Sequence, residues 1–224
     1  MSFFERLMSE TRAGRAALAG VPQIRDGLRG QISLGTYVAY LSQAYHHVKH
    51  TVPLMQAAKA GLDPAHARFA RALDEYIAEE TGHEEWVLND IGHCGSDAEA
   101  VRHGAPSPAT RAMTDYVYDY IARVNPMGFF GMVMVLEGTS VQLATHGASA
   151  VAASLGLGPQ CFSYLSSHGA LDQEHLVFFQ RLMDEVDDPA DQAAIIVAAQ
   201  GVFTRFAEMF RTIPHDAPAV QHVA

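Results

Sequence analysis

The chain has little cysteine and little positive charge. Its 224 residues include two cysteines and 15 lysines and arginines, against 25 aspartates and glutamates, and its formal net charge is −10. Cys94 and Cys161 lie far apart and form no CxxC pair, which argues against a disulfide framework or a thiolate metal site. Nucleic acids and anionic membrane surfaces attract basic proteins, so this charge balance argues against both as partners.

The chain also lacks a signal-peptide core and a long uninterrupted apolar run. Residues 2–15 mix charges with apolar side chains, unlike the apolar centre of a signal peptide. Residues 126–155 come nearest to a membrane span, but Glu137, His146 and several Gly and Ser interrupt them. We therefore expect a cytoplasmic, reduced protein.

What fills the sequence is helical periodicity. Strand signals are nearly absent, and apolar residues recur at helical spacing in segments bounded by Gly and Pro. The predicted helices are residues 2–19, 33–60, 64–91, 108–124, 126–155, 160–186 and 189–210. No repeat or linker divides them, so we expect one all-α domain of about seven helices. This domain would cover residues 1–212, and residues 213–224 would form a loose tail.

His168, Asp172 and His175 form the most informative pattern in the chain. They stand at i, i+4 and i+7, so in an α-helix they project from one face. Imidazole together with carboxylate is a ligand set suited to iron and other transition metals. The alternative is a packed helix whose polar face is rich in histidine, since Phe178 and Phe179 follow. Taken alone, this set leaves the histidine-rich packed helix as the commoner case.

Glu80 and His83 form a Glu-x-x-His pair, which on a helix of a di-iron bundle presents two ligands to the interior. Alone the pair is a weak indication, because acid-rich segments such as residues 74–85 are commonly solvated helix faces. Gly82 lowers helix stability by about 1 kcal/mol relative to Ala, which normally has a packing or functional reason. Trp86 indicates that the face carrying His83 packs inward.

Glu137 is the only Asp, Glu, Lys or Arg between Arg123 and Asp172. Burying such a carboxylate without a partner or a metal costs several kcal/mol. A buried acid bonded to Tyr or Ser hydroxyl groups is the alternative to a metal ligand. The three patterns occurring together favour metal binding much more strongly than any one of them.

His46, His47 and His50 lie within the predicted helix 33–60. His46 and His50 share a face, and His47 lies about 100° away from His46. One of them is a candidate for a further ligand or a pocket residue, and a partly exposed surface cluster is the alternative. No Gly-rich phosphate loop, nucleophile elbow or Ser-His-Asp pattern occurs, and no catalytic acid or base can be assigned.

These residues resemble those of the haem-oxygenase-like iron-containing oxidase superfamily over about residues 30–212. The resemblance implies a haem-oxygenase-like, TenA-like helical bundle. The metal-bearing branch contains non-haem di-iron oxidases, and the haem-oxygenase fold itself does not imply haem. The ligands that the resemblance implies are Glu80, His83, Glu137, His168, Asp172 and His175.

One departure from the family concerns the second iron ion. Several relatives add a carboxylate from the helix before the Glu-x-x-His helix, whereas residues 38–53 contain no Asp or Glu. The resemblance implies two iron ions with O2 as co-substrate, and without that carboxylate the second ion is either labile or absent. His47 or a neighbouring histidine would stand in for the absent carboxylate.

The function implied is an O2-activating oxidase or oxygenase. No Lys or Arg lies between Arg123 and Arg181, so we expect a small apolar or amine-bearing substrate rather than a phosphorylated one. A metal-free enzyme or binder of the TenA or quinone-cofactor-synthase kind, using the pocket for acid–base chemistry, is a second hypothesis. A non-catalytic helical interaction protein is a third. The partners expected are the small-molecule substrate and, in a homodimer, a second copy of the chain.

Overall fold

The protein folds as an all-helical bundle. The structure, a computed structural model, describes residues 1–215, apart from the side chains of Gln142 and residues 168–174. Within residues 1–215 there is no β-strand, so the predicted fold class is confirmed. The α-helices are α1 (Phe3–Glu10), α2 (Arg12–Ala19), α3 (Pro22–Gly27), α4 (Leu34–Val48), α5 (Thr51–Gly61), α6 (Ala67–Glu80), α7 (His83–His93), α8 (Ala98–His103), α9 (Pro108–Arg123), α10 (Phe129–Leu155), α11 (Ser163–Asp184) and α12 (Pro189–Thr212). Three 3-10 helices join them: η1 (Pro64–His66), η2 (Pro126–Gly128) and η3 (Pro159–Cys161).

The structure has more helices than the seven predicted, because three predicted helices are each broken in two and the short helices α3 and α8 lie outside the predicted ranges. Helix 2–19 breaks at Thr11, whose hydroxyl donates to the carbonyl of Leu7 at 2.7 Å and so competes with the helical backbone. Helix 33–60 breaks at Lys49 and His50. Helix 64–91 breaks at Gly82, which has φ +95°. Helical periodicity continues across each break, so it does not reveal them.

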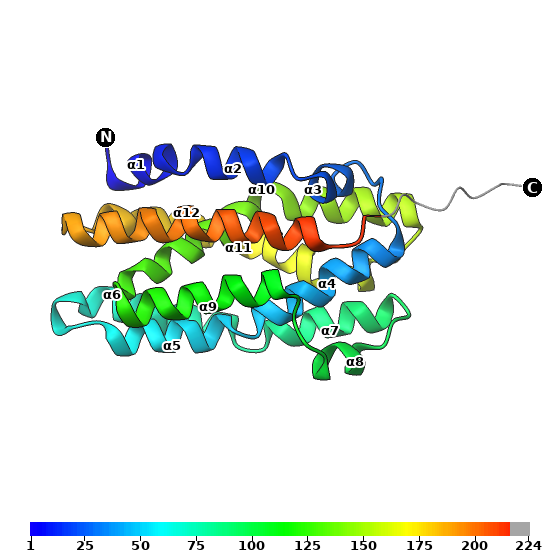
Figure 1. Ribbon diagram of the computed structural model, residues 1–224, viewed down its shortest axis with the longest axis horizontal. Helices are drawn as coiled ribbons and strands as arrows, with labels where there is room; N and C mark the ends of the chain where they lie inside the picture. Colours follow the sequence, from blue (N-terminus) through cyan, green and yellow to red (C-terminus); the bar gives the residue numbers. More distant parts are fainter. Residues whose placement is uncertain (216–224) are drawn as a thin grey trace, which may run out of the picture.

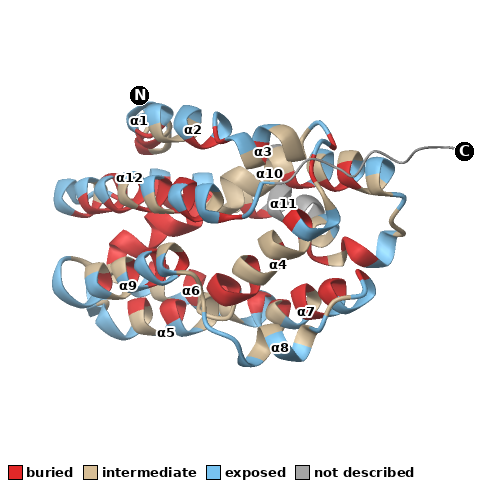
Figure 2. Ribbon diagram, turned by 45° about the vertical axis from the view of Figure 1, so that its right-hand side comes forward, coloured by how far each residue is buried: buried red, intermediate tan, exposed pale blue. Residues whose placement is uncertain are grey.

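The helices lie roughly along one long axis (Figure 1). In that view α1 to α3 run along one edge, α12 and α9 cross the middle, and α5 lies at the opposite edge. Buried residues follow the inward faces of these helices and exposed residues the outward faces (Figure 2). This pattern is the amphipathic arrangement that the helical spacing of apolar residues predicts.

The buried apolar side chains form two separate clusters. The larger cluster joins α5, α6, α9, the first half of α10 and α12, and includes Phe130 and Phe203. The smaller cluster joins α4, α7, the second half of α10 and η3, and includes Tyr37 and Phe162. Because α10 contributes to both, it connects the two cores, and the space between them is where a cavity can lie.

Helix α12 is long and apolar enough, by length and composition alone, to cross a membrane. The same composition is found in a helix enclosed by others in a bundle core. Here α12 packs against α2, α9 and α10, and its side chains Ile195, Val202 and Phe203 are almost fully buried. Its apolar character is therefore accounted for by the core.

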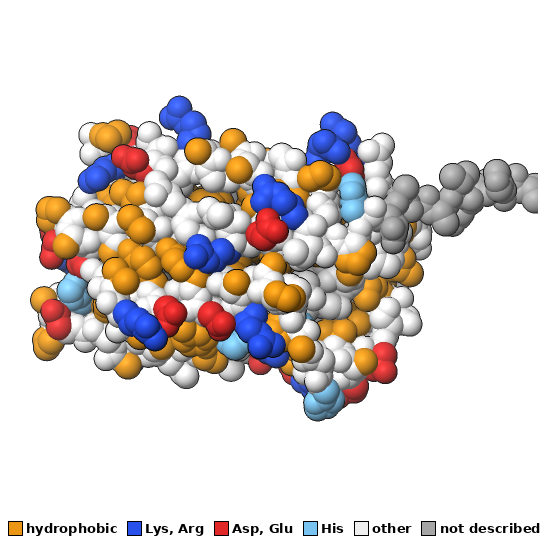
Figure 3. Space-filling view, viewed as in Figure 1, with side chains coloured by type: hydrophobic (Ala, Val, Ile, Leu, Met, Phe, Trp, Pro, Cys, Tyr) orange, Lys and Arg blue, Asp and Glu red, His pale blue; other side chains and the backbone are white. Residues whose placement is uncertain are grey.

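On the face shown in Figure 3, Lys and Arg side chains alternate with Asp and Glu rather than forming a patch of one sign.

The residues predicted as a loose tail begin inside the bundle. Ile213 is 3% exposed, and its carbonyl accepts a hydrogen bond from Nε2 of Gln23 at 3.0 Å. His215 forms an ion pair with Asp26 at 3.1 Å. Residues 216–224 of the predicted tail lie outside the described residues.

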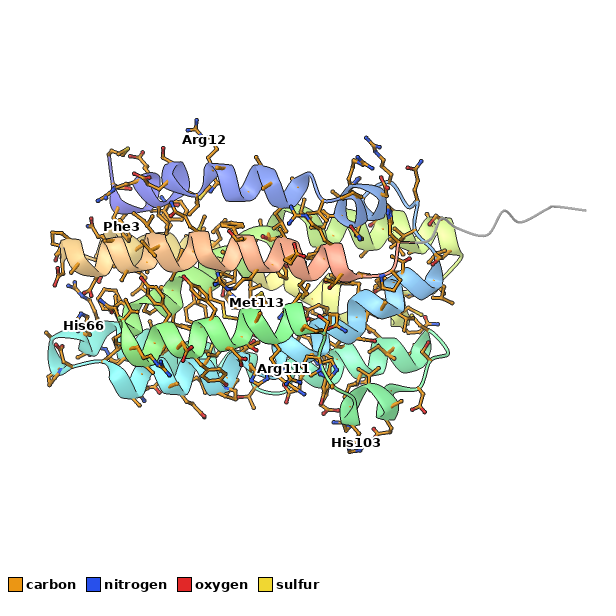
Figure 4. All side chains as sticks on the ribbon, in the orientation of Figure 1. Phe3, Arg12, His66, His103, Arg111 and Met113 are labelled. Carbon is orange, nitrogen blue, oxygen red and sulfur yellow. The ribbon has the colours of Figure 1, made fainter. Side chains whose placement is uncertain are left out.

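His66 connects η1 to the start of α12 at one end of the bundle (Figure 4). Its Nε2 lies 2.8 Å from Asp191, a buried carboxylate, and its Nδ1 lies 2.7 Å from Asp63. Asp191 also accepts a hydrogen bond from Asn125 at 2.8 Å. The hydrogen bond to Asp191, followed by that to Asp63, raises the pKa of His66 above its usual 6.5, while burial opposes the rise.

We expect the His66 network to make stability depend on pH. Because the folded-state pKa is raised, the contribution is fully present below pH 6.5 and is lost as pH rises through the folded-state pKa. The free energy of unfolding of the wild type relative to His66→Gln should therefore be larger at pH 6 than at pH 9, measured by urea unfolding. His103→Gln, at an exposed histidine, is the control. If the free energies of unfolding of the wild type and His66→Gln differed equally at both pH values, the raised pKa of His66 would be contradicted.

Candidate metal centre and cavity

A large cavity lies between the two apolar clusters. Its empty space is about 1360 Å³, counted out to the solvent at its opening. Members of both clusters line it, among them Met55, Phe129 and Phe206 from the larger and Tyr37 and Val151 from the smaller. No Lys or Arg is among its described lining residues.

The cavity is elongated along the helices. On α4 it is lined from Thr36 to His47, and on α10 from Phe129 to Val151; at 1.5 Å per residue the α4 segment alone spans about 16 Å. Helix α12 follows the same direction: Phe206 lies edge-on to His47 and Phe210 stacks on Tyr40. The apolar passage therefore runs along α4 from Thr36 to His47 and continues past it to Thr51 and Met55 of α5.

Glu80 and His83 lie on either side of a helix break. Glu80 is the last residue of α6 and His83 is the first of α7, so the expectation that one helix carries both was wrong. The left-handed backbone of Gly82 turns the chain between them. Nδ1 of His83 nevertheless lies 3.0 Å from Oε2 of Glu80, and both side chains are buried.

The surroundings hold this pair in place. The ring of His83 stacks on Trp86 with centroids 3.9 Å apart, as expected from the position of Trp86 on the inward face. Glu80 lines the cavity. The His83 imidazole therefore lies beside a carboxylate that lines the cavity.

Glu137 and His175 form a second pair, joining α10 to α11. Nδ1 of His175 lies 3.8 Å from Oε1 of Glu137, and their side chains are 10% and 12% exposed. Nε2 of His175 lies 2.8 Å from Oε2 of Glu79. Tyr76 packs edge-on against the His175 ring. Glu137 lines the cavity with Glu80 and His47.

The two contacts of His175 constrain its chemistry. When Nε2 donates its proton to Glu79, a neutral ring presents the lone pair of Nδ1, and the carboxylate of Glu137 beside it is also an acceptor. Either a proton on Nδ1 or a metal ion shared by the two groups would satisfy both. Histidine ligands in metalloproteins commonly donate their other ring N–H to a carboxylate, and Glu79 is placed for that role.

Among the three histidines of the 46–50 segment, only His47 lines the cavity. His46 is buried beside Lys49, whose ammonium lies 3.2 Å from its Nδ1. Burial, followed by the charge of Lys49, lowers the pKa of His46 to about 4. His50 contacts Tyr118 at 3.2 Å. His47 is therefore the candidate for an additional ligand, and His46 and His50 are structural.

His168 and Asp172 belong to α11, but their side chains lie outside the described residues. Among the side chains that are described, no group of three His, Cys, Asp or Glu is placed to hold one ion. The chemistry of the donors nevertheless fits iron, because they are carboxylate oxygens and imidazole nitrogens around a mostly apolar space.

The two cysteines are buried elsewhere; burial and the neighbouring Cys161 raise the pKa of Cys94 to about 12.

The sequence does not indicate the contact between Glu79 and His175 or the position of Ser140 at the cavity. Glu79 had been included in a solvated acidic face, and its side chain is indeed 55% exposed while still contacting His175. Ser140, one turn after Glu137 on α10, also lines the cavity, and its hydroxyl has no partner among the described residues. Neither position carries a local pattern that distinguishes it from an ordinary helical residue.

Solved structures of similar fold cover nearly the whole chain. A domain of unknown function with a haem-oxygenase-like fold from Shewanella denitrificans has a TM-score of 0.85 at 21% identity, covering 95% of this chain and 92% of its own. A TenA homologue from Pseudomonas syringae has a TM-score of 0.76 at 13% identity, covering 93% and 90%. Haem oxygenase-1 from Synechocystis, in complex with haem, has a TM-score of 0.72 at 14% identity, covering 94% and 91%. At these identities the likeness concerns the fold.

The sequence itself is informative about the family. No curated protein matches the chain, but the family model described as iron-containing redox enzyme matches residues 38–204. This range includes every candidate ligand on α4, α6, α7, α10 and α11. The chain therefore belongs to the haem-oxygenase-like family of iron-containing redox enzymes.

Proposed function

We propose that this protein is a non-haem iron-dependent oxidase or oxygenase that uses O2. The observation that carries the proposal is the pair of buried imidazole–carboxylate contacts, Glu80 with His83 and Glu137 with His175, whose two carboxylates line one apolar cavity. Iron would be held by these four residues together with His168 and Asp172. The one-electron redox chemistry needed to activate O2 would be supplied by the bound iron.

The protein's own residues have separable roles in this proposal. Glu79 fixes the orientation of the His175 ring through Nε2. His47 is the ligand proposed for a second, labile ion, in place of the carboxylate absent from residues 38–53. The apolar side chains of α10 and α12 exclude water from the reacting region, which strengthens electrostatic interactions there.

The cavity lining bears on the substrate. With Glu80 and Glu137 but no Lys or Arg among its described lining residues, the cavity disfavours ligands that carry several negative charges, such as phosphate esters or the propionates of haem. An apolar body fits its elongated shape. We therefore propose an apolar or amine-bearing substrate, with its reacting end near Glu80 and Glu137.

Two other functions are less well supported. A thiaminase of the TenA kind would use a cysteine in the pocket, whereas Cys94 and Cys161 are not among the described lining residues. A purely structural interaction protein would have no need for a cavity of this size containing buried carboxylates. The metal-free binder remains the second candidate because Glu80 and Glu137 could act as acid–base groups on an amine.

The proposal is tested by O2 uptake of protein loaded anaerobically with Fe(II). We expect uptake to require iron and to be faster with linear alkylamines than with alkyl phosphates of equal length. Protein treated with a strong chelator is the control. Binding of an alkylamine with no iron-dependent O2 uptake across a panel of such substrates would favour the metal-free alternative.

A further inference from the structure

Helix α11, which carries three of the candidate ligands, begins without a cap from its own sequence. Its N-cap residue is Phe162, which makes no side-chain capping bond. By contrast α4, α9 and α12 are capped by Ser33, Ser107 and Asp188, each directly before its helix. The first N–H groups of a helix have no intrahelical partner. A helix of this length in the interior therefore requires acceptors from elsewhere.

Asp90 of α7 provides these acceptors. Its Oδ1 accepts the backbone N–H of Ser163 at 2.9 Å and also contacts the Ser163 hydroxyl. Its Oδ2 accepts the backbone N–H of Tyr164 at 3.0 Å. Asp90 is 0% exposed, and no Lys or Arg among the described residues forms an ion pair with it. Burial raises the pKa of Asp90, while its hydrogen bonds with Ser163 and Tyr164 act in the opposite direction.

The position of Asp90 on α7 connects this cap to the candidate metal centre. Asp90 follows His83 by about two turns, so the two side chains lie on the same face of α7. That face contacts α11 and η3. On α11, His168 comes little more than one turn after Ser163. One buried carboxylate thus ties the helix that carries His83 to the first turn of the helix that carries His168, Asp172 and His175.

We propose that Asp90 is a positioning residue for the metal centre, fixing the height and rotation of α11 relative to α7. This inference rests on the proposed iron site. A capping serine at position 162 in place of Phe162 would stabilise α11 equally well, but it would not connect α11 to α7. A cap supplied by another ligand-bearing helix sets the position and rotation of one helix relative to the other. Removing an interaction that orients a metal ligand without touching the metal typically lowers metal affinity by about 10- to 100-fold.

The test compares Asp90→Asn with Asp191→Asn. Asparagine keeps the size of the side chain, but its NH2 group cannot accept a backbone N–H, so one of the contacts to Ser163 or Tyr164 is lost. Asp191 is a matched control because it is also a buried aspartate bonded at both oxygens, to His66 and Asn125, at the start of α12 and away from the cavity. Both variants should melt at lower temperature than the wild type.

Only Asp90→Asn should weaken Fe(II) binding, by about 10-fold or more, measured by anaerobic titration at a temperature where both variants are folded. Amide hydrogen exchange of iron-free protein should also become faster in peptides covering residues 163–175 in Asp90→Asn, but not in Asp191→Asn. Equal iron affinities of the two variants, or unchanged exchange in Asp90→Asn, would overturn the inference. If the wild type itself binds no iron, the proposed function fails, and the exchange measurement decides on Asp90.

Discussion

Replacing Glu137 by alanine is expected to abolish Fe(II) binding and to leave a folded helical protein. Glu137 is the carboxylate that faces Nδ1 of His175 across 3.8 Å, and it is the only ionisable residue proposed as a ligand on α10. Alanine has the highest helix propensity, so the helix should persist. Anaerobic Fe(II) titration measures the loss, and far-UV circular dichroism verifies the fold.

A second variant distinguishes the loss of a metal ligand from the loss of a residue that orients one. Glu79→Ala removes only the carboxylate bonded to Nε2 of His175, so we expect iron affinity to fall by about 10- to 100-fold rather than to vanish. If Glu137→Ala instead unfolded the protein while Glu137→Gln kept both the fold and full iron content, Glu137 would be a structural acid.

Replacing Gly82 by alanine should impair both stability and iron binding. Gly82 has φ +95° and joins Glu80 to His83, and a left-handed conformation costs a non-glycine residue roughly 1–2 kcal/mol. A Cβ at this position would meet nothing within 4 Å, so the effect is one of backbone conformation only. Alanine favours continuing α6 into α7, which would keep Glu80 and His83 on one helix face but would redirect α7, and His83 with it, relative to α11.

Gly95 offers a matched control for this change. It also has a left-handed backbone, at φ +78°, and a Cβ there would also meet nothing within 4 Å, but it follows α7 at the end remote from His83. Gly95→Ala should lower the free energy of unfolding by a similar amount, measured by urea unfolding, and leave Fe(II) affinity unchanged. Wild-type iron affinity in Gly82→Ala would show that the helix break is not needed for the site.

The all-α fold could be predicted because apolar periodicity is a local property of the sequence. The breaks at Thr11, His50 and Gly82 could not, since the periodicity continues through them. At Gly82 the sequence does contain the signal, a glycine that is costly inside a helix. Interpreting it as a helix break requires knowing how α7 packs against α4 and α11, which no local pattern shows.

The site could be predicted in part for a similar reason. Spacing singled out His83, Glu137 and His175, each of which the structure places beside another donor; their role as ligands stays a prediction. Spacing could not choose among His46, His47 and His50, because the face that meets the interior depends on where Phe206 of α12 packs. Asp90 had no local signal at all, because its partners Ser163 and Tyr164 are distant in sequence.

The central claim is that this cavity holds iron through carboxylates and histidines. Anaerobic titration of the wild-type protein with Fe(II), followed by Mössbauer spectroscopy of the 57Fe-loaded sample, tests it most directly. The account predicts high-spin non-haem Fe(II) bound at one tight site, with a second, weaker site that is lost in His47→Asn but retained in His46→Asn. Failure to bind Fe(II), or tight binding that survives the removal of both Glu137 and His175, would contradict it.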